Sequence, residues 1–164
     1  MVILYLALAY FFIVWIGTRL IVPHLGFNRE LLPPSIPAEL DQRIRQFDHE
    51  SISNLDFLKK SYGFVTQTYQ GSRFKTITNF WKAFQNPLNL KPGFMPCNGQ
   101  NYLLRLMLIK SDRFTEKDIQ IRIVPLNFFI HQYLRINVDG QWVEVDPWSA
   151  FLGVPFGKKS AFLG

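Results

Sequence analysis

The sequence predicts an α+β domain that follows one N-terminal apolar helix, and three observations support this. An uncharged stretch of 18 residues opens the chain. Between residues 40 and 110, apolar side chains recur at the spacings of three and four that are typical of helices. The C-terminal third alternates as strands around Asp139-Gly140, a dipeptide that strongly favours a two-residue hairpin turn. Helices that precede an antiparallel sheet in this way indicate an α+β fold.

Composition excludes several classes of protein. The 164 residues suffice for one domain with a core, and an apolar fraction of 48% excludes a disordered chain. A single cysteine excludes an intrachain disulfide and a zinc site built from several thiolates. The net charge of +6 is scattered along the chain and forms no nucleic-acid-binding motif. We therefore expect no nucleic-acid partner, but a basic surface that suits anionic lipid.

Residues 1–22 are predicted to form a single-pass membrane anchor. Eighteen helical residues span about 27 Å, close to the thickness of the hydrocarbon layer, and the start lacks the basic region of a cleaved signal peptide. The alternative is a core helix of the domain. Arg19 and Arg29 follow the span, so the positive-inside rule favours the cytoplasmic side for the rest of the chain, but two residues leave the side open.

Three helices are expected after the anchor. Residues 23–39 are rich in proline and predict a semi-rigid spacer, so that the domain occupies residues 40–164. Apolar periodicity predicts helices over 37–47, 53–70 and 73–87, the second capped by Ser53 or Asn54. Residues 88–96 contain two prolines and a glycine and predict an irregular connection.

The only cysteine, Cys97, lies at the predicted start of the central helix. Residues 100–109 are apolar almost all round, which indicates a helix buried at the centre of the domain. Pro96 is tolerated only at a helix start, so it places Cys97 at the N-terminus, where the helix dipole favours a thiolate and can stabilise an oxyanion. The alternative is an ordinary buried thiol that acts as a small apolar residue.

A hairpin in the C-terminal third provides a histidine and an aspartate. Residues 118–124 alternate as a strand, and a two-residue turn at Asp139-Gly140 would set Arg135 opposite Glu144. In this register Asp146 is the diagonal neighbour of His131, within reach of a hydrogen bond. A slip of one residue would put these two side chains on opposite faces.

The segments "PCNGQNYLLRLML" and "HQYLRINVDGQWVEVDPW" resemble the core of the transglutaminase-like superfamily of papain-like thiol enzymes. The resemblance covers roughly residues 50–150. It implies a Cys-bearing helix packed on a small antiparallel sheet. It also implies a catalytic triad of Cys97, His131 and Asp146.

Other site residues are less defined by the resemblance. Such proteins often have an aromatic residue after the cysteine, where this chain has Asn98, and a small residue and Trp after the histidine, where it has Gln132 and Tyr133. Candidates for lining the substrate cleft or for binding the oxyanion are Trp81, Asn98, Gln100, Tyr133 and Trp142.

The expected activity is acyl transfer from a peptide or amide bond through a thioester on Cys97. Water as acceptor gives a peptidase or amidase, and an amine gives a transglutaminase-type transferase; the sequence leaves both open. We expect a protein or peptide substrate near the membrane, and no cofactor or metal. Two alternatives are an inactive binding module of the same fold and a structural or metal role for the three residues. For a metal site, one Cys, one His and one Asp are few ligands, and their spacing in the sequence matches no zinc-binding pattern.

Overall fold

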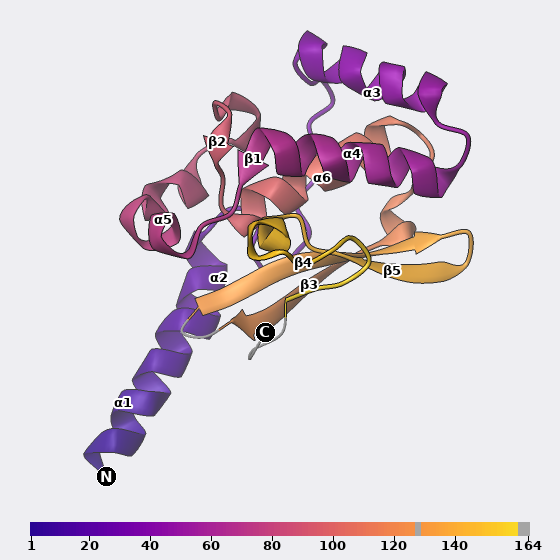
Figure 1. The fold of residues 1–164 in the computed structure, drawn as a ribbon. Helices are drawn as coiled ribbons and strands as arrows, with labels where there is room; N and C mark the ends of the chain where they lie inside the picture. The colour runs from indigo at the N-terminus through magenta and orange to yellow at the C-terminus, as the bar shows by residue number, and fades with distance from the viewer. Residues whose placement is uncertain (127–128, 161–164) are drawn as a thin grey trace.

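The computed structural model describes residues 1–126 and 129–160 and has a mixed α+β architecture with an N-terminal apolar helix (Figure 1). The predicted fold class is confirmed at this level. The α-helices are α1 (Val2–Phe11), α2 (Thr18–Ile21), α3 (Ala38–Glu50), α4 (Asn54–Thr68), α5 (Arg73–Thr78) and α6 (Cys97–Lys110). The strands are β1 (Tyr69–Gln70), β2 (Gly93–Phe94), β3 (Ile119–Leu126), β4 (Phe129–Val138) and β5 (Gln141–Val145). Short 3-10 helices are η2 (Phe80–Phe84), η3 (Pro87–Asn89), η4 (Glu116–Asp118) and η5 (Trp148–Leu152).

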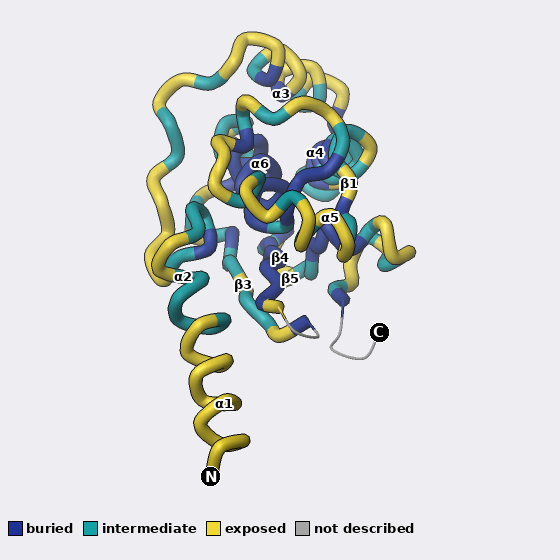
Figure 2. The backbone as a smooth tube through the Cα atoms, turned by 90° about the vertical axis from the view of Figure 1, so that its left-hand side faces the viewer, coloured by how far each residue is buried: buried dark blue, intermediate teal, exposed yellow. Residues whose placement is uncertain are grey.

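The N-terminal helix projects away from the rest of the molecule (Figures 1 and 2). It runs over Val2–Ile21, and η1 (Phe12–Gly17) gives its middle a turn of π-helix between α1 and α2. Its 20 residues are long and apolar enough to cross a membrane. The first 13 residues of the chain are exposed, whereas η1 contacts β4. The helix therefore meets the domain only through its last turns.

The segment predicted as a spacer is held against the domain by hydrogen bonds at several points. Gln132 Nε2 donates to the His24 carbonyl at 2.7 Å, and Lys110 Nζ donates to the Pro34 carbonyl at 3.0 Å. Leu25 is buried. Figure 2 shows this segment running from α2 along one side of the molecule to α3. Residues 23–39 are therefore attached to the domain and do not form a free linker.

The first two predicted helices of the domain form, and the third is shorter than expected. Ser53 caps α4 by accepting a hydrogen bond from the Asp56 N–H, as predicted. The third helix, α5, ends at Thr78 because Asn79 leaves the helical conformation with φ −126° and ψ 34°. The chain then continues as η2, so the apolar side chains of this region divide between two short helices.

The core lies around α6, which is sandwiched between α4 and the larger sheet (Figure 1). All of its residues from 98 to 108 are buried, as the sequence predicts for a helix that is apolar almost all round. Leu104 and Leu106 contribute to the same hydrophobic cluster as Phe57 of α4 and Leu134 and Ile136 of β4. The start of α6 is thereby fixed relative to β4, which carries His131.

The larger sheet has the strand order β3-β4-β5 and is antiparallel throughout. The predicted hairpin register is confirmed: Val138 pairs with Gln141, and Arg135 pairs with Glu144. Asp139 and Gly140 have φ values of 53° and 90°, and such a positive-φ pair is what a type I′ turn requires. Residues 127–128, at the start of the predicted hairpin segment, lie outside the described residues.

We expect Gly71→Ala to destabilise the packing of η5. Gly71 is buried, and an added Cβ would lie 2.2 Å from the Trp148 carbonyl oxygen and 2.5 Å from the Phe151 ring. Overpacking of this kind costs about 1–3 kcal/mol. The matched control is Gly63→Ala inside α4, where the nearest atom, on Gln67, is 4.0 Å from the added Cβ. Chemical unfolding should show a lower free energy of unfolding only for Gly71→Ala. Equal unfolding midpoints for the two variants would contradict this expectation.

Candidate active site

Local structure around β2 sets the position of the cysteine. Strand β2 pairs with β1 in parallel, and the Met95 N–H donates to the Gln70 carbonyl at 3.2 Å. Gly93 has φ 123°, a conformation that residues with a side chain rarely adopt. Pro96 then adopts φ −63° and ψ 161°, and α6 begins at Cys97. Cys97 is half-buried, and it lies where the first N–H groups of a helix lack intrahelical partners.

The histidine and the aspartate are joined by a buried hydrogen bond. His131 Nε2 lies 2.8 Å from Asp146 Oδ2, and the two residues are only 2% and 1% exposed. This confirms the diagonal contact that the hairpin register predicts. The Trp148 ring lies beside the imidazole, with 5.1 Å between the ring centroids. The histidine ring is therefore oriented by one polar partner and one aromatic neighbour.

Two serines complete the surroundings of the Asp146 carboxylate. Ser149 donates through its hydroxyl at 2.7 Å and through its backbone N–H at 3.2 Å. Ser160 donates through its backbone N–H and its hydroxyl, both at 3.1 Å. The two hydroxyl oxygens lie 2.7 Å apart. A buried carboxylate with this many donors is held in one orientation and in its ionised form.

The pKa values of the pair shift in opposite directions. Burial opposes the charged form of His131, but hydrogen bonds with Asp146 and Cys97, together with their charges, outweigh it and raise the pKa of His131 to about 10. Burial likewise opposes ionisation of Asp146, but hydrogen bonds from His131, Ser160 and Ser149 and the His131 charge lower its pKa below 3.8. At neutral pH the pair is thus an imidazolium beside a carboxylate.

The thiol of Cys97 contacts the same imidazole. Hydrogen bonding and charge from Cys97 help to raise the pKa of His131, so the two side chains are neighbours. Because Asp146 occupies Nε2, the ring nitrogen that remains for the thiol is Nδ1. Both residues line a cavity of about 400 Å³ between α5, the start of α6 and β4. Its other walls are mostly apolar and include Phe74, Ile77, Leu126, Ile130 and Trp148. The structure therefore brings the three predicted triad residues together at one cavity.

Two of the candidate cleft residues are engaged in structural hydrogen bonds instead. Asn98 is 4% exposed, and its Nδ2 donates to the carbonyls of Pro23 and Ala83. Gln100 is fully buried, and its Nε2 donates to the Met95 carbonyl at 2.9 Å. Neither lines the cavity. Their side chains hold the start of α6 in place.

The three aromatic candidates also lie outside the cavity lining. Trp81 is 49% exposed on η2. Tyr133 is buried on β4, and its hydroxyl accepts from Lys159 Nζ at 2.9 Å. Trp142 is 39% exposed on β5 beneath the Arg135 guanidinium. The backbone N–H groups at the start of α6 remain the oxyanion donors that the fold offers next to the thiol.

Sequence reasoning missed the residues that surround Asp146 and line the cavity. A signal for Ser149 was available, since a serine three residues after an aspartate can donate to the carboxylate in a local turn. Ser160 has no such signal, because it reaches Asp146 through tertiary structure. Phe74 and Ile77 were predicted only as parts of a helix.

The titration of His131 can be followed directly. Its pKa in the folded chain, about 10, exceeds the ordinary 6.5, so the protonated ring stabilises the fold fully below pH 6.5. This contribution is lost as pH rises from 6.5 toward 10. We expect nitrogen NMR to show a protonated ring well above pH 6.5, and Cys97→Ala to lower the pKa by removing one hydrogen bond and one charge. A ring that loses its proton near 6.5 would contradict this.

Among residues 1–126 and 129–160, no group of three or more His, Cys, Asp or Glu side chains is arranged to hold a metal ion. Searches for similar proteins return no family model, no curated protein and no solved structure that matches the chain.

Proposed function

We propose that the chain is a membrane-anchored thiol enzyme of the transglutaminase-like, papain-like type that transfers acyl groups from peptide or amide bonds. The observation that carries the proposal is the buried hydrogen bond between His131 and Asp146 beside the half-buried Cys97. Asp146 fixes the ring and compensates its charge, which leaves Nδ1 to exchange a proton with the thiol. The Cys–His–Asp chain order and the "G-x-W-x-x-x-D-P" pattern agree with this assignment.

The reaction starts from the thiolate form of Cys97 beside the protonated His131 ring. The thiolate attacks the carbonyl carbon, and N–H groups at the start of α6 bind the oxygen that becomes negative. His131 then donates its proton to the departing amine, the C–N bond breaks, and a thioester remains on Cys97. Water or a second amine gives its proton to His131 and attacks the thioester, the C–S bond breaks, and the product leaves the Cys97 thiolate beside the protonated ring.

The cavity favours a substrate with an apolar group next to the reacting carbonyl. Phe74 and Ile77 on α5 face Leu126 and Ile130 of the sheet across it, and Trp148 closes one side. A charged group would lose its hydration against these apolar side chains, and Arg73, which also lines the cavity, is exposed to solvent. Arg19 and Arg29 after the anchor favour, by the positive-inside rule, a reaction at the cytoplasmic face of the membrane.

The test uses peptides that carry an electrophilic chloromethyl ketone after either Phe or Asp. With the full chain in detergent, we expect mass spectrometry to find the adduct on Cys97, formed faster with the Phe peptide. His131→Ala should abolish the fast reaction. Ile77→Lys should weaken the preference for Phe, while Ile52→Lys, at an equally apolar residue that is 96% exposed, should not. Labelling of Cys97 at the same rate with both peptides and in His131→Ala would reject the proposed enzyme. Reversible binding of the peptides without an adduct would indicate the alternative, a binding module.

A further inference from the structure

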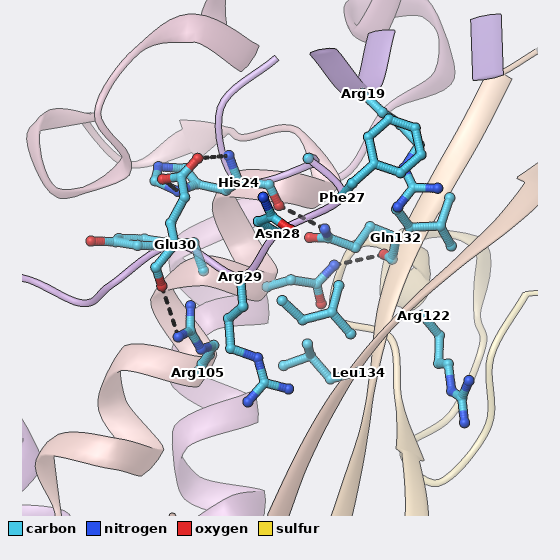
Figure 3. A pocket seen from close by; sticks show the side chains of 15 residues that line it. Arg19, His24, Phe27, Asn28, Arg29, Glu30, Arg105, Arg122, Gln132 and Leu134 are labelled. Atoms are coloured by element: carbon cyan, nitrogen blue, oxygen red, sulfur yellow. Dashed lines mark hydrogen bonds and ion pairs between the residues drawn. The ribbon is translucent and has the colours of Figure 1, made fainter. Parts of the chain in front are cut away.

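A second cavity, of about 370 Å³, lies between the segment after the N-terminal helix, α6 and strands β3 and β4 (Figure 3). Neither Cys97 nor His131 lines it. Four arginines contribute to its walls: Arg19 of α2, Arg29 of the following segment, Arg105 of α6 and Arg122 of β3. The cavity is therefore separate from the candidate active site and has a different chemical character.

Two of the four arginines are already paired. Arg29 and Arg105 both contact the Glu116 carboxylate, at 2.7 Å and 2.6 Å. The one carboxylate in the lining, Glu30, contacts His24 Nδ1 at 2.7 Å, and desolvation by burial lowers the pKa of this histidine below 6.5. Glu30 and Glu116 thus offset part of the positive charge, and a net positive charge remains at the cavity.

The other two arginines have no carboxylate partner among the residues that the structure describes. The Arg19 guanidinium lies 3.8 Å from the Phe27 ring centre, and its Nε is buried without a hydrogen-bond partner. Arg122 is exposed, and its guanidinium donates to Gln120 Oε1 at 2.6 Å. Ile121, the neighbour of Arg122 in β3, packs against the core on the α6 side, so the Arg122 side chain lies on the other face of the strand, and Figure 3 shows it pointing away from the cavity. Arg19 is therefore the unpaired cation available to bind an anion at the cavity.

A buried amide adds a second, independent indication of a ligand. Asn101 on α6 is 1% exposed and lines the cavity. Its Nδ2 donates to the Gln132 carbonyl at 2.6 Å, whereas its Oδ1 is buried and has no partner among the described residues. A buried acceptor without a partner costs free energy that a ligand with an O–H or N–H group would recover. The cavity thus offers a cation for an anion and an acceptor for a neighbouring donor.

The place of the cavity along the helix indicates where such a ligand comes from. Arg19 lies near the end of the apolar helix Val2–Ile21, whose 20 residues span about 30 Å, the thickness of a hydrocarbon layer. In an inserted helix Arg19 lies at the level of the lipid phosphates. We propose that this cavity binds the headgroup of an anionic phospholipid. Its phosphate contacts Arg19, and a headgroup hydroxyl donates to Asn101. The proposal requires insertion of the helix but no chemistry at Cys97.

The test measures binding of short-chain phosphatidylglycerol and phosphatidylcholine to the full chain in neutral detergent by native mass spectrometry. We expect phosphatidylglycerol to bind at least about tenfold more tightly, since only it combines a net negative charge with hydroxyl donors. Arg19→Gln should remove this difference between the two lipids. Arg43→Gln, on α3, changes the net charge of the protein equally and should leave the difference intact. Arg19→Glu should weaken phosphatidylglycerol binding further.

Three results would overturn the proposal. Equal binding of the two lipids would show that the cavity does not select an anionic headgroup. An equal loss in the α3 variant would assign the effect to the overall charge of the protein. Displacement of the lipid by inorganic phosphate at concentrations comparable to the lipid's would identify a site for free phosphate instead of a lipid.

Discussion

Replacing His131 with Ala is expected to slow alkylation of Cys97 by iodoacetamide at about pH 6 by at least about tenfold. The protonated His131 ring, whose pKa is raised to about 10, lies beside the thiol and stabilises the thiolate by its charge. Only the thiolate is alkylated, and an ordinary cysteine is mostly protonated below about pH 8. The chain has a single cysteine, so the incorporated label reports on Cys97 alone.

The matched control is His49→Ala, which removes an exposed histidine from α3 and should leave the reaction unchanged. If the wild type and His131→Ala are alkylated at the same rate, Cys97 and His131 do not form an ion pair, and the proposed acyl transfer has no activated nucleophile.

The second large effect is expected from Asp146→Ala, which should lower the free energy of unfolding by about 3–5 kcal/mol. The change leaves His131 buried without the partner that compensates its charge, and it removes the acceptor for the hydroxyls of Ser149 and Ser160. Asp146→Asn should cost less, since its amide oxygen still accepts hydrogen bonds.

Denaturant unfolding of the full chain in detergent measures the difference. Asp41→Ala serves as the control, because Asp41 is partly exposed and pairs with Arg45 on the surface of α3. Exposed pairs of this kind contribute about 0–1 kcal/mol. A loss for Asp146→Ala no larger than that for Asp41→Ala would mean that the buried network does not stabilise the fold.

Local chemistry made part of the site predictable from the sequence. Asp139 and Gly140 define the turn, the turn defines the register, and the register brings Asp146 to His131. Proline is tolerated at the start of a helix but not in its interior, so Pro96 indicates that α6 starts at Cys97. Each of these steps connects residues that are close in sequence or directly paired in a hairpin.

The parts that could not be predicted depend on contacts between distant segments. Ser160 reaches Asp146 through the course of the C-terminal segment, and many serines in the chain have the same donor group. Asn98 follows the cysteine directly, yet its side chain donates to the carbonyls of Pro23 and Ala83 in distant segments. The Gln100 side chain donates to the nearby Met95 carbonyl. Proximity in sequence to the cysteine therefore did not indicate a place in the cavity.

The hydrogen bonds that hold residues 23–36 against the domain have a consequence for how far the thiol can travel. A free linker of the predicted length, residues 23–39, could extend to about 60 Å and would let the domain take many positions relative to the membrane. Here the Gln132 and Lys110 side chains bind that segment, and η1 contacts β4, so these contacts shorten the connection between helix and domain. On an inserted helix, they would keep Cys97 within a narrow range of heights above the bilayer. For the acyl transfer that we propose, substrate bonds at that height would then be reached and bonds further from the membrane would not.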